Sequence, residues 1–238
     1  MLETSDGMLN KSSQTYKCQY CNKAFKKEVT LSAHVCEKKR RWQQEKETAV
    51  QFGLKAYLRF FEYTQIGKTK TYADFVDSPY YIGFVKFGRH CVAIKCLHVV
   101  NFTNWLLKNN KKLDDWTKDS FYQEWMYEYL RKENAQDALE RGLMTMQRYA
   151  DATEGMVDFN GYFRYGNANR ICYHISTGRI SPWVIYNCDS GVNFLSSLSE
   201  EQVGMIMQWI DPDYWHRSLT ELRSDTDWCK GILTAAGL

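Results

Sequence analysis

Four potential metal ligands lie close together near the N-terminus, and their spacing constrains this part of the chain more than any other feature. Cys18 and Cys21 are separated by two residues, and His34 and Cys36 follow within the next fifteen. So small a segment buries little apolar surface, and a structural zinc ion supplies on the order of 10 kcal/mol of folding free energy to such units. The pattern predicts Zn²⁺ as cofactor, with Cys18, Cys21, His34 and Cys36 as metal ligands.

Residues 16–36 resemble a C2H2 zinc finger. Besides the cysteine pair and His34, the segment has Phe25 and Leu31 where this family has its small apolar core. The resemblance covers about a tenth of the 238-residue chain. It implies a ββα fold at residues 14–37, in which thiolates on a hairpin and an imidazole on a helix converge on zinc.

The fourth ligand departs from the family pattern. The second histidine of the family would fall within residues 38–40, where the sequence has only Lys and Arg, and Cys36 is the nearby donor. Residues two apart on an α-helix point about 200° apart, whereas in an extended segment they share a side. We therefore predict a C2HC site in which the helix ends at His34, Val35 is extended and Cys36 closes the site. A histidine from the rest of the chain or a water molecule is the alternative ligand.

The N-terminal region is strongly basic. Residues 11–46 contain ten Lys or Arg against three Glu, although the net charge of the whole chain is only +3. A basic head on a slightly acidic remainder indicates a polyanionic partner, DNA or RNA. The residues predicted to contact nucleic acid are Lys26, Lys27, Thr30, Lys38, Lys39, Arg40, Arg41 and Trp42.

These residues favour contact with phosphates over the reading of bases. By the zinc-finger resemblance, the base-reading positions correspond to Lys27, Thr30 and Ala33, which together discriminate poorly between bases. The basic run at 38–41 suits phosphate contacts, and Trp42 offers one stacking ring. The alternatives are a solvated basic helix face and an acidic protein surface as the partner.

The remainder of the chain predicts a mostly helical domain. We expect a flexible N-terminus at residues 1–13, a basic connector helix at 38–46, and a body at 47–238 in which apolar residues recur at helical spacing. Capping residues mark three helix starts in the body, at Asn134, Ser199 and Asp211.

The pattern changes towards the C-terminus. Near residues 169–188, β-branched and aromatic residues alternate around a "STGR" turn, which predicts a β-hairpin with strands near 169–176 and 180–188. The predicted fold class is therefore α+β: a small ββα zinc finger, followed by a mostly helical domain with a C-terminal β-hairpin.

The hairpin segment carries the most chemically suggestive residues of the body. His174, Arg179 and Asp189 could form a phosphate-handling site at 170–190 of an enzyme that acts on nucleic acid or a nucleotide. A Walker loop, a GxSxG elbow and paired carboxylates are absent from the sequence, so we favour a protein that is not an enzyme. A second metal site at His90, Cys96 and His98 would require these residues to share one face of a strand.

Several hypotheses on function follow. The first is a zinc-binding accessory protein that contacts DNA or RNA through the finger and connector, while the body binds another protein. The alternatives are a protein-protein adaptor that uses the finger and the enzyme described above. The chain looks cytoplasmic, because its first residues are polar, it has no apolar run of about 18 residues, and its eight cysteines are thinly spread.

Two further strings, "CEKKRRW" at 36–42 and "HISTGRISPWVIYNCDSG" at 174–191, resemble proteins that large tailed bacteriophages encode. The resemblance implies an accessory factor in replication, transcription or host takeover, acting in the cytoplasm of an infected bacterium. It supplies no activity.

Overall fold

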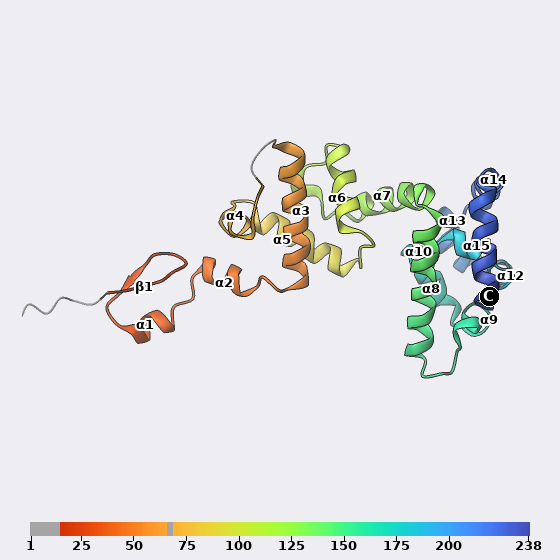
Figure 1. The fold of residues 1–238 in the computed structure, drawn as a ribbon, viewed down its shortest axis with the longest axis horizontal. Coiled ribbons are helices and arrows are strands. Elements are labelled where there is room, and N and C mark those ends of the chain that lie inside the picture. The colour runs from red at the N-terminus through yellow and green to blue at the C-terminus, as the bar shows by residue number, and fades with distance from the viewer. Residues whose placement is uncertain (1–14, 66–68) are drawn as a thin grey trace, which may run out of the picture. The chain divides into compact units, whose positions relative to one another are not determined.

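The computed structural model describes residues 15–65 and 69–238, and the flexible N-terminus expected at residues 1–13 lies outside them. The described chain is mostly helical, with a two-stranded antiparallel sheet near its start (Figure 1). It agrees in outline with the expected α+β class. Two compact units are present: unit 1 runs to Ile94 and includes Asn110–Asp114, and unit 2 comprises Lys95–Asn109 and Asp115–Leu238.

Unit 1 begins with the small sheet. Strand β1 (Tyr16–Lys17) pairs antiparallel with β2 (Ala24–Phe25), and Tyr16 lies opposite Phe25. The helices of this unit are α1 (Glu28–Ser32), α2 (Glu37–Gln43), α3 (Thr48–Thr64), α4 (Tyr72–Asp77) and α5 (Tyr81–Ala93). Helix α2 lies where the connector helix was expected, and it ends at Gln43 instead of residue 46.

Helices α3 and α5 form the centre of unit 1 and approach each other closely. A Cβ added to Gly88 of α5 would lie 1.9 Å from the carbonyl oxygen of Ala49, and one added to Gly53 of α3 would lie 2.7 Å from that of Phe84. Glycine at both positions therefore lets the two backbones touch. Around this crossing the buried apolar side chains are Val50, Ala56, Tyr57, Phe75, Phe84, Phe87 and Cys91.

Unit 2 is built from helices. They are α6 (Val99–Lys108), α7 (Asp119–Lys132), α8 (Ala135–Ala152), α9 (Tyr162–Tyr165), α10 (Ala168–Ser176), α11 (Pro182–Ile185), α12 (Asp189–Ser196), α13 (Glu200–Ile210), α14 (Pro212–Glu221) and α15 (Arg223–Ala235). Two 3₁₀ turns, η1 (Leu113–Asp115) and η2 (Phe159–Gly161), complete the described elements. Helix α8 packs against α11 and α15, and α10 packs against α13.

The three helix starts predicted from capping residues are confirmed. The Asn134 side chain accepts a hydrogen bond from the Asp137 N–H (2.7 Å), and Ser199 forms a capping box with Gln202. Asp211 caps α14, whose first residue is a proline. Each cap satisfies a backbone N–H that the helix itself leaves without a partner.

The β-hairpin expected near 169–188 is wrong. Residues Ala168–Ser176 form α10 and Pro182–Ile185 form α11. The β-branched and aromatic residues of this stretch lie on amphipathic helices that bury one face, and burial overrides their preference for strands.

The "STGR" turn is a helix C-terminus. Gly178 has a φ of +68°, its N–H donates to the carbonyl of Ile175 (2.9 Å), and the Arg179 N–H donates to the carbonyl of His174 (2.8 Å). This pair of bonds is a Schellman motif, which ends a helix with a glycine in the left-handed region. The same glycine conformation occurs in hairpin turns, which is why the sequence pattern was ambiguous.

None of the helices in the described ranges combines the length and apolarity that crossing a membrane requires.

The close approach of α3 and α5 generates a test. We expect Gly88→Ala to destabilise unit 1 by about 2–3 kcal/mol, because the new methyl group collides with backbone that cannot move alone. Hydrogen exchange of the α3 and α5 amides in the full chain measures the loss. The control is Gly204→Ala in α13, where an added Cβ meets no atom within 4 Å and should be neutral or stabilising. Unchanged protection in Gly88→Ala would contradict the packing described.

Candidate metal centre

The four predicted metal ligands converge. Single donor atoms from Cys18, Cys21, His34 and Cys36 all lie within 4.8 Å of one another. The Sγ of Cys21 and the Nε2 of His34 are 3.3 Å apart. Tetrahedral zinc, with Zn–S near 2.3 Å and Zn–N near 2.0 Å, separates its ligands by about 3.5–3.8 Å. The cluster is therefore close to the size that a zinc ion needs, and it can hold a metal ion.

The first two donors are placed by the turn between β1 and β2. The Cys18 N–H donates to the carbonyl of Lys23 (2.9 Å), and the Asn22 N–H donates to the carbonyl of Cys18 (2.8 Å). Asn22 adopts a positive φ of 59°, which asparagine tolerates better than most residues. This closed turn buries the Cys18 thiol and leaves Cys21 exposed.

The other two donors are placed by a break between helices. Helix α1 ends at Ser32, His34 and Val35 lie outside any helix or strand, and Cys36 is extended, with φ −98° and ψ 164°. The helix thus ends two residues earlier than predicted, and the expected break between His34 and Cys36 is present. Because the chain is not helical there, both side chains reach the same cluster.

Apolar contacts support the imidazole. The ring of Phe25 packs against that of His34 with centroids 4.8 Å apart, and the half-buried Leu31 lines the same small hollow as His34. The ammonium group of Lys39 donates to the His34 carbonyl (3.2 Å). These contacts hold the His34 side chain and backbone beside the thiols.

The clustered thiols ionise unequally. A hydrogen bond from the Cys21 backbone holds the pKa of Cys18 below its usual value. The Lys23 backbone lowers the pKa of Cys21 in the same way, but partial desolvation by the neighbouring chain and the thiols of Cys18 and Cys36 outweigh it, and the pKa of Cys21 is raised. A thiolate at Cys18 therefore makes ionisation of the Cys21 thiol less favourable. A divalent cation bound to both sulfurs would offset this repulsion between like charges.

Cys36 has a second role as the N-cap of α2. Its Sγ accepts a hydrogen bond from the Lys39 N–H (3.4 Å). Helix α2 is in turn attached to α4: Arg41 donates to the Val76 carbonyl (2.7 Å), and the Tyr72 hydroxyl donates to the Arg41 carbonyl (2.6 Å). The donor cluster is thereby connected through α2 to the helical part of unit 1.

The residues predicted to contact nucleic acid fall into two groups. Lys26, Lys27 and Thr30 are exposed around the start of α1. In α2, by contrast, basic side chains form ion pairs within unit 1: Lys38 pairs with Asp77 (2.7 Å), and Arg40 pairs with Glu37 (2.5 Å).

Arg41 and Trp42 serve packing. The Arg41 side chain is 17% exposed, pairs with Glu37 (3.2 Å) and lies over the ring of Tyr81 (4.4 Å). Trp42 is half-buried and meets Tyr72 edge-on with ring centroids 5.1 Å apart. Both side chains therefore make contacts within unit 1, and their contact with a nucleic acid stays a prediction. The spacing of four between Glu37 and Arg41 was a readable sign of an internal ion pair.

The other candidate residues are placed differently from the prediction. His174 and Arg179 line one cavity of unit 2, whereas Asp189 is exposed in the first turn of α12 and lies outside that lining. The strand proposed to align His90, Cys96 and His98 is not formed, since His90 lies in α5 and the other two precede α6. Lys95, Arg148 and Arg170 also line the cavity and were missed.

We find no protein-family model, curated protein or solved structure that matches this chain at a significant level.

The double role of Cys36 can be separated by mutation. We expect Cys36→Ser to lower zinc affinity at least about 100-fold while keeping a good N-cap, and Cys36→Ala to remove ligand and cap together at a further cost of about 1 kcal/mol. Zinc affinity is measured by competition with a chelator, and stability by denaturation. Cys96→Ala, which removes a thiol outside the cluster, is the control. Full zinc affinity in both Cys36 variants would exclude Cys36 as a ligand.

Proposed function

We propose that residues 15–36 form a C2HC zinc finger whose metal is structural. The observation that carries this proposal is the convergence of three thiols and one imidazole within 4.8 Å. Four protein donors fill a tetrahedral zinc ion and leave no position for a reacting water, as in structural zinc sites. In this site the ion would fix the turn between β1 and β2 against the break before α2.

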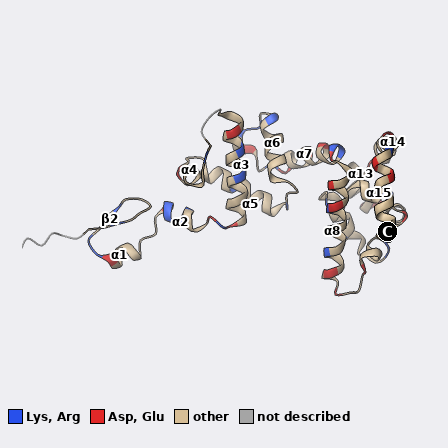
Figure 2. Ribbon diagram, viewed as in Figure 1, with Lys and Arg blue, Asp and Glu red and all other residues tan. Residues whose placement is uncertain are grey.

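We propose further that the finger contacts DNA or RNA through phosphates. Lys17, Lys23, Lys26 and Lys27 are all exposed and surround the turn and the start of α1, and Figure 2 shows the basic residues of this region. Within residues 15–65 and 69–238, none of these four lysines forms an ion pair with the chain itself. Their charges are free to neutralise phosphates, which gives affinity without sequence preference.

The contact area limits this interaction. A single finger buries roughly 600–1,000 Å² on DNA, so additional affinity must come from another part of the chain or from a partner. This behaviour suits an accessory factor that acts on DNA or RNA beside other proteins, as the resemblance to phage proteins implies.

A second candidate function is a protein adaptor. Val29 on α1 and Val35 after it are 78% and 65% exposed, and apolar side chains on so small a surface suit a protein partner. Substituting both valines by serine would abolish such binding and would leave phosphate contacts intact.

The nucleic-acid proposal predicts a specific salt dependence. For duplex DNA, we expect log affinity to fall linearly with log salt, and the Lys26→Gln/Lys27→Gln variant to lower the slope by about two, one for each lost phosphate contact. Neutralising Lys38 and Arg40, which already pair within the chain, should change the slope less. Arg217→Gln/Lys230→Gln, with the same loss of charge in unit 2, is the control. An affinity for DNA that does not change with salt concentration would contradict the proposal.

A further inference from the structure

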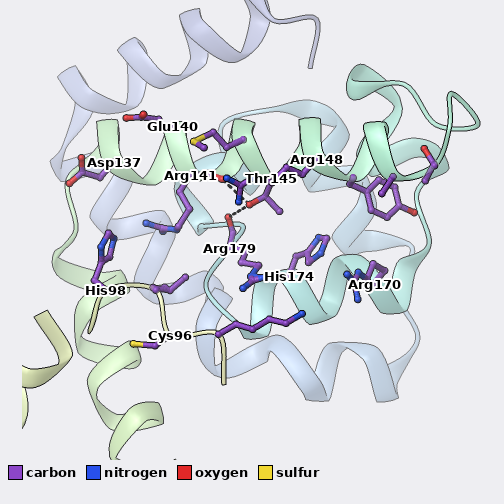
Figure 3. Close-up of a pocket in the computed structure, with 16 residues that line it drawn as sticks. Cys96, His98, Asp137, Glu140, Arg141, Thr145, Arg148, Arg170, His174 and Arg179 are labelled. Atoms are coloured by element: carbon purple, nitrogen blue, oxygen red, sulfur yellow. Dashed lines mark hydrogen bonds between the residues drawn. The ribbon is translucent and has the colours of Figure 1, made fainter. Parts of the chain in front are cut away.

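Unit 2 contains a cavity of about 760 Å³ whose lining comes from four segments: α8, α10, the residues before α6 and the turn after α10 (Figure 3). A cavity of this size lies within the range of small-molecule sites in proteins, which is about 300–1,000 Å³. It is too large for a single phosphate or metal ion and suits a molecule of the size of a sugar phosphate or a nucleotide.

The cavity lining is rich in cations. It contains Lys95, Arg141, Arg148, Arg170 and Arg179 against two carboxylates, Asp137 and Glu140. Arg141 is neutralised by the buried Glu133 (2.7 Å). In the described part of the chain the other four cations have no ion-pair partner. Positive charge gathered in a concave site attracts an anion.

Three of these cations lie near one histidine. Lys95 and Arg170 both approach the ring of Tyr173, at 5.7 and 5.3 Å from its centroid. The neighbouring His174 is buried, and its Nδ1 contacts the hydroxyl of Tyr162 (2.7 Å). Burial, followed by the charges of Arg170, Arg179 and Lys95, lowers the pKa of His174 to about 4. The imidazole is therefore neutral near pH 7 and does not repel the three neighbouring cations.

The turn that presents Arg179 is held from α8. The Nε of Arg141 donates to the Gly178 carbonyl (2.7 Å). The Thr145 hydroxyl, which donates to the Arg141 carbonyl (2.8 Å), also lies 3.4 Å from the Arg179 carbonyl. The Schellman motif fixes the same turn from α10. A cation on a fixed backbone loses less freedom when it binds an anion, which favours binding.

The two carboxylates lie apart from the cations around His174. Asp137 and Glu140 come from the first turns of α8, and in Figure 3 they lie on the opposite side of the lining from His174 and Arg170. Carboxylates accept hydrogen bonds from hydroxyl groups. The lining thus has basic side chains at one end and carboxylates that can accept hydrogen bonds at the other.

We propose that this cavity binds a phosphate-bearing small molecule, a sugar phosphate or a nucleotide, with its phosphate held by Arg170, Arg179 and Lys95. The hydroxyl groups of the ligand face Asp137 and Glu140. Guanidinium groups from two sides of a cavity suit the double charge and the several acceptor oxygens of a phosphate better than they suit a single carboxylate. The site lies within unit 2 and does not depend on the zinc finger.

Calorimetric titration of the full zinc-loaded chain with ribose 5-phosphate, inorganic phosphate and ribose tests this proposal. We expect ribose 5-phosphate to bind most tightly, phosphate more weakly and ribose not at all. The Arg170→Gln/Arg179→Gln variant should weaken binding of ribose 5-phosphate about 100-fold, since it removes two charge-assisted contacts. Arg217→Gln, an exposed arginine outside the lining, should leave it unchanged.

Two further variants keep the test decisive. Lys95→Gln, on an exposed side chain, should weaken the binding about tenfold even if the double variant folds poorly. Glu140→Gln should reduce the advantage of ribose 5-phosphate over phosphate. Equal binding by wild type and Lys95→Gln, or binding of an oligonucleotide but of neither phosphate compound, would overturn the proposal.

Discussion

One sulfur atom joins the donor cluster of unit 1 to the helix that follows it. The Sγ of Cys36 lies in the donor cluster and also accepts the Lys39 N–H that begins α2. Because α2 is attached to α4 through Arg41, the segment with the donor cluster is joined to the helices of unit 1 by hydrogen bonds between side chains and backbone. Lys38, Arg40 and Arg41 of α2 form ion pairs within unit 1, whereas the lysines around the turn and α1 are exposed.

The local parts of this structure could be predicted from the sequence. The spacing of Cys18 and Cys21, together with the impossibility of a helix that aims both His34 and Cys36 at one ion, was sufficient to predict the donor cluster and the break between α1 and α2. Capping residues such as Asn134 were readable because a cap is an interaction between residues three positions apart.

The rest depends on contacts between distant residues. Gly178 follows the end of a helix, α10, and not the first strand of a hairpin. The burial of one face of α10 favours the helix over the strand at this position. The contact between Trp42 and Tyr72 could not be predicted, because the two residues are 30 positions apart in the sequence. For the cavity of unit 2, the seven-residue spacing of Arg141 and Arg148 was enough to predict that they lie on one face of α8. That this face packs beside the turn at Arg179 could not be predicted from the sequence.

We propose that three sulfurs and one nitrogen bind a single zinc ion. X-ray absorption at the zinc edge of the zinc-loaded full chain tests it most directly. We expect three sulfur ligands near 2.3 Å and one imidazole nitrogen near 2.0 Å. A shell of two sulfurs with nitrogen or oxygen ligands would contradict it, because Cys36 would then cap α2 without closing the metal site.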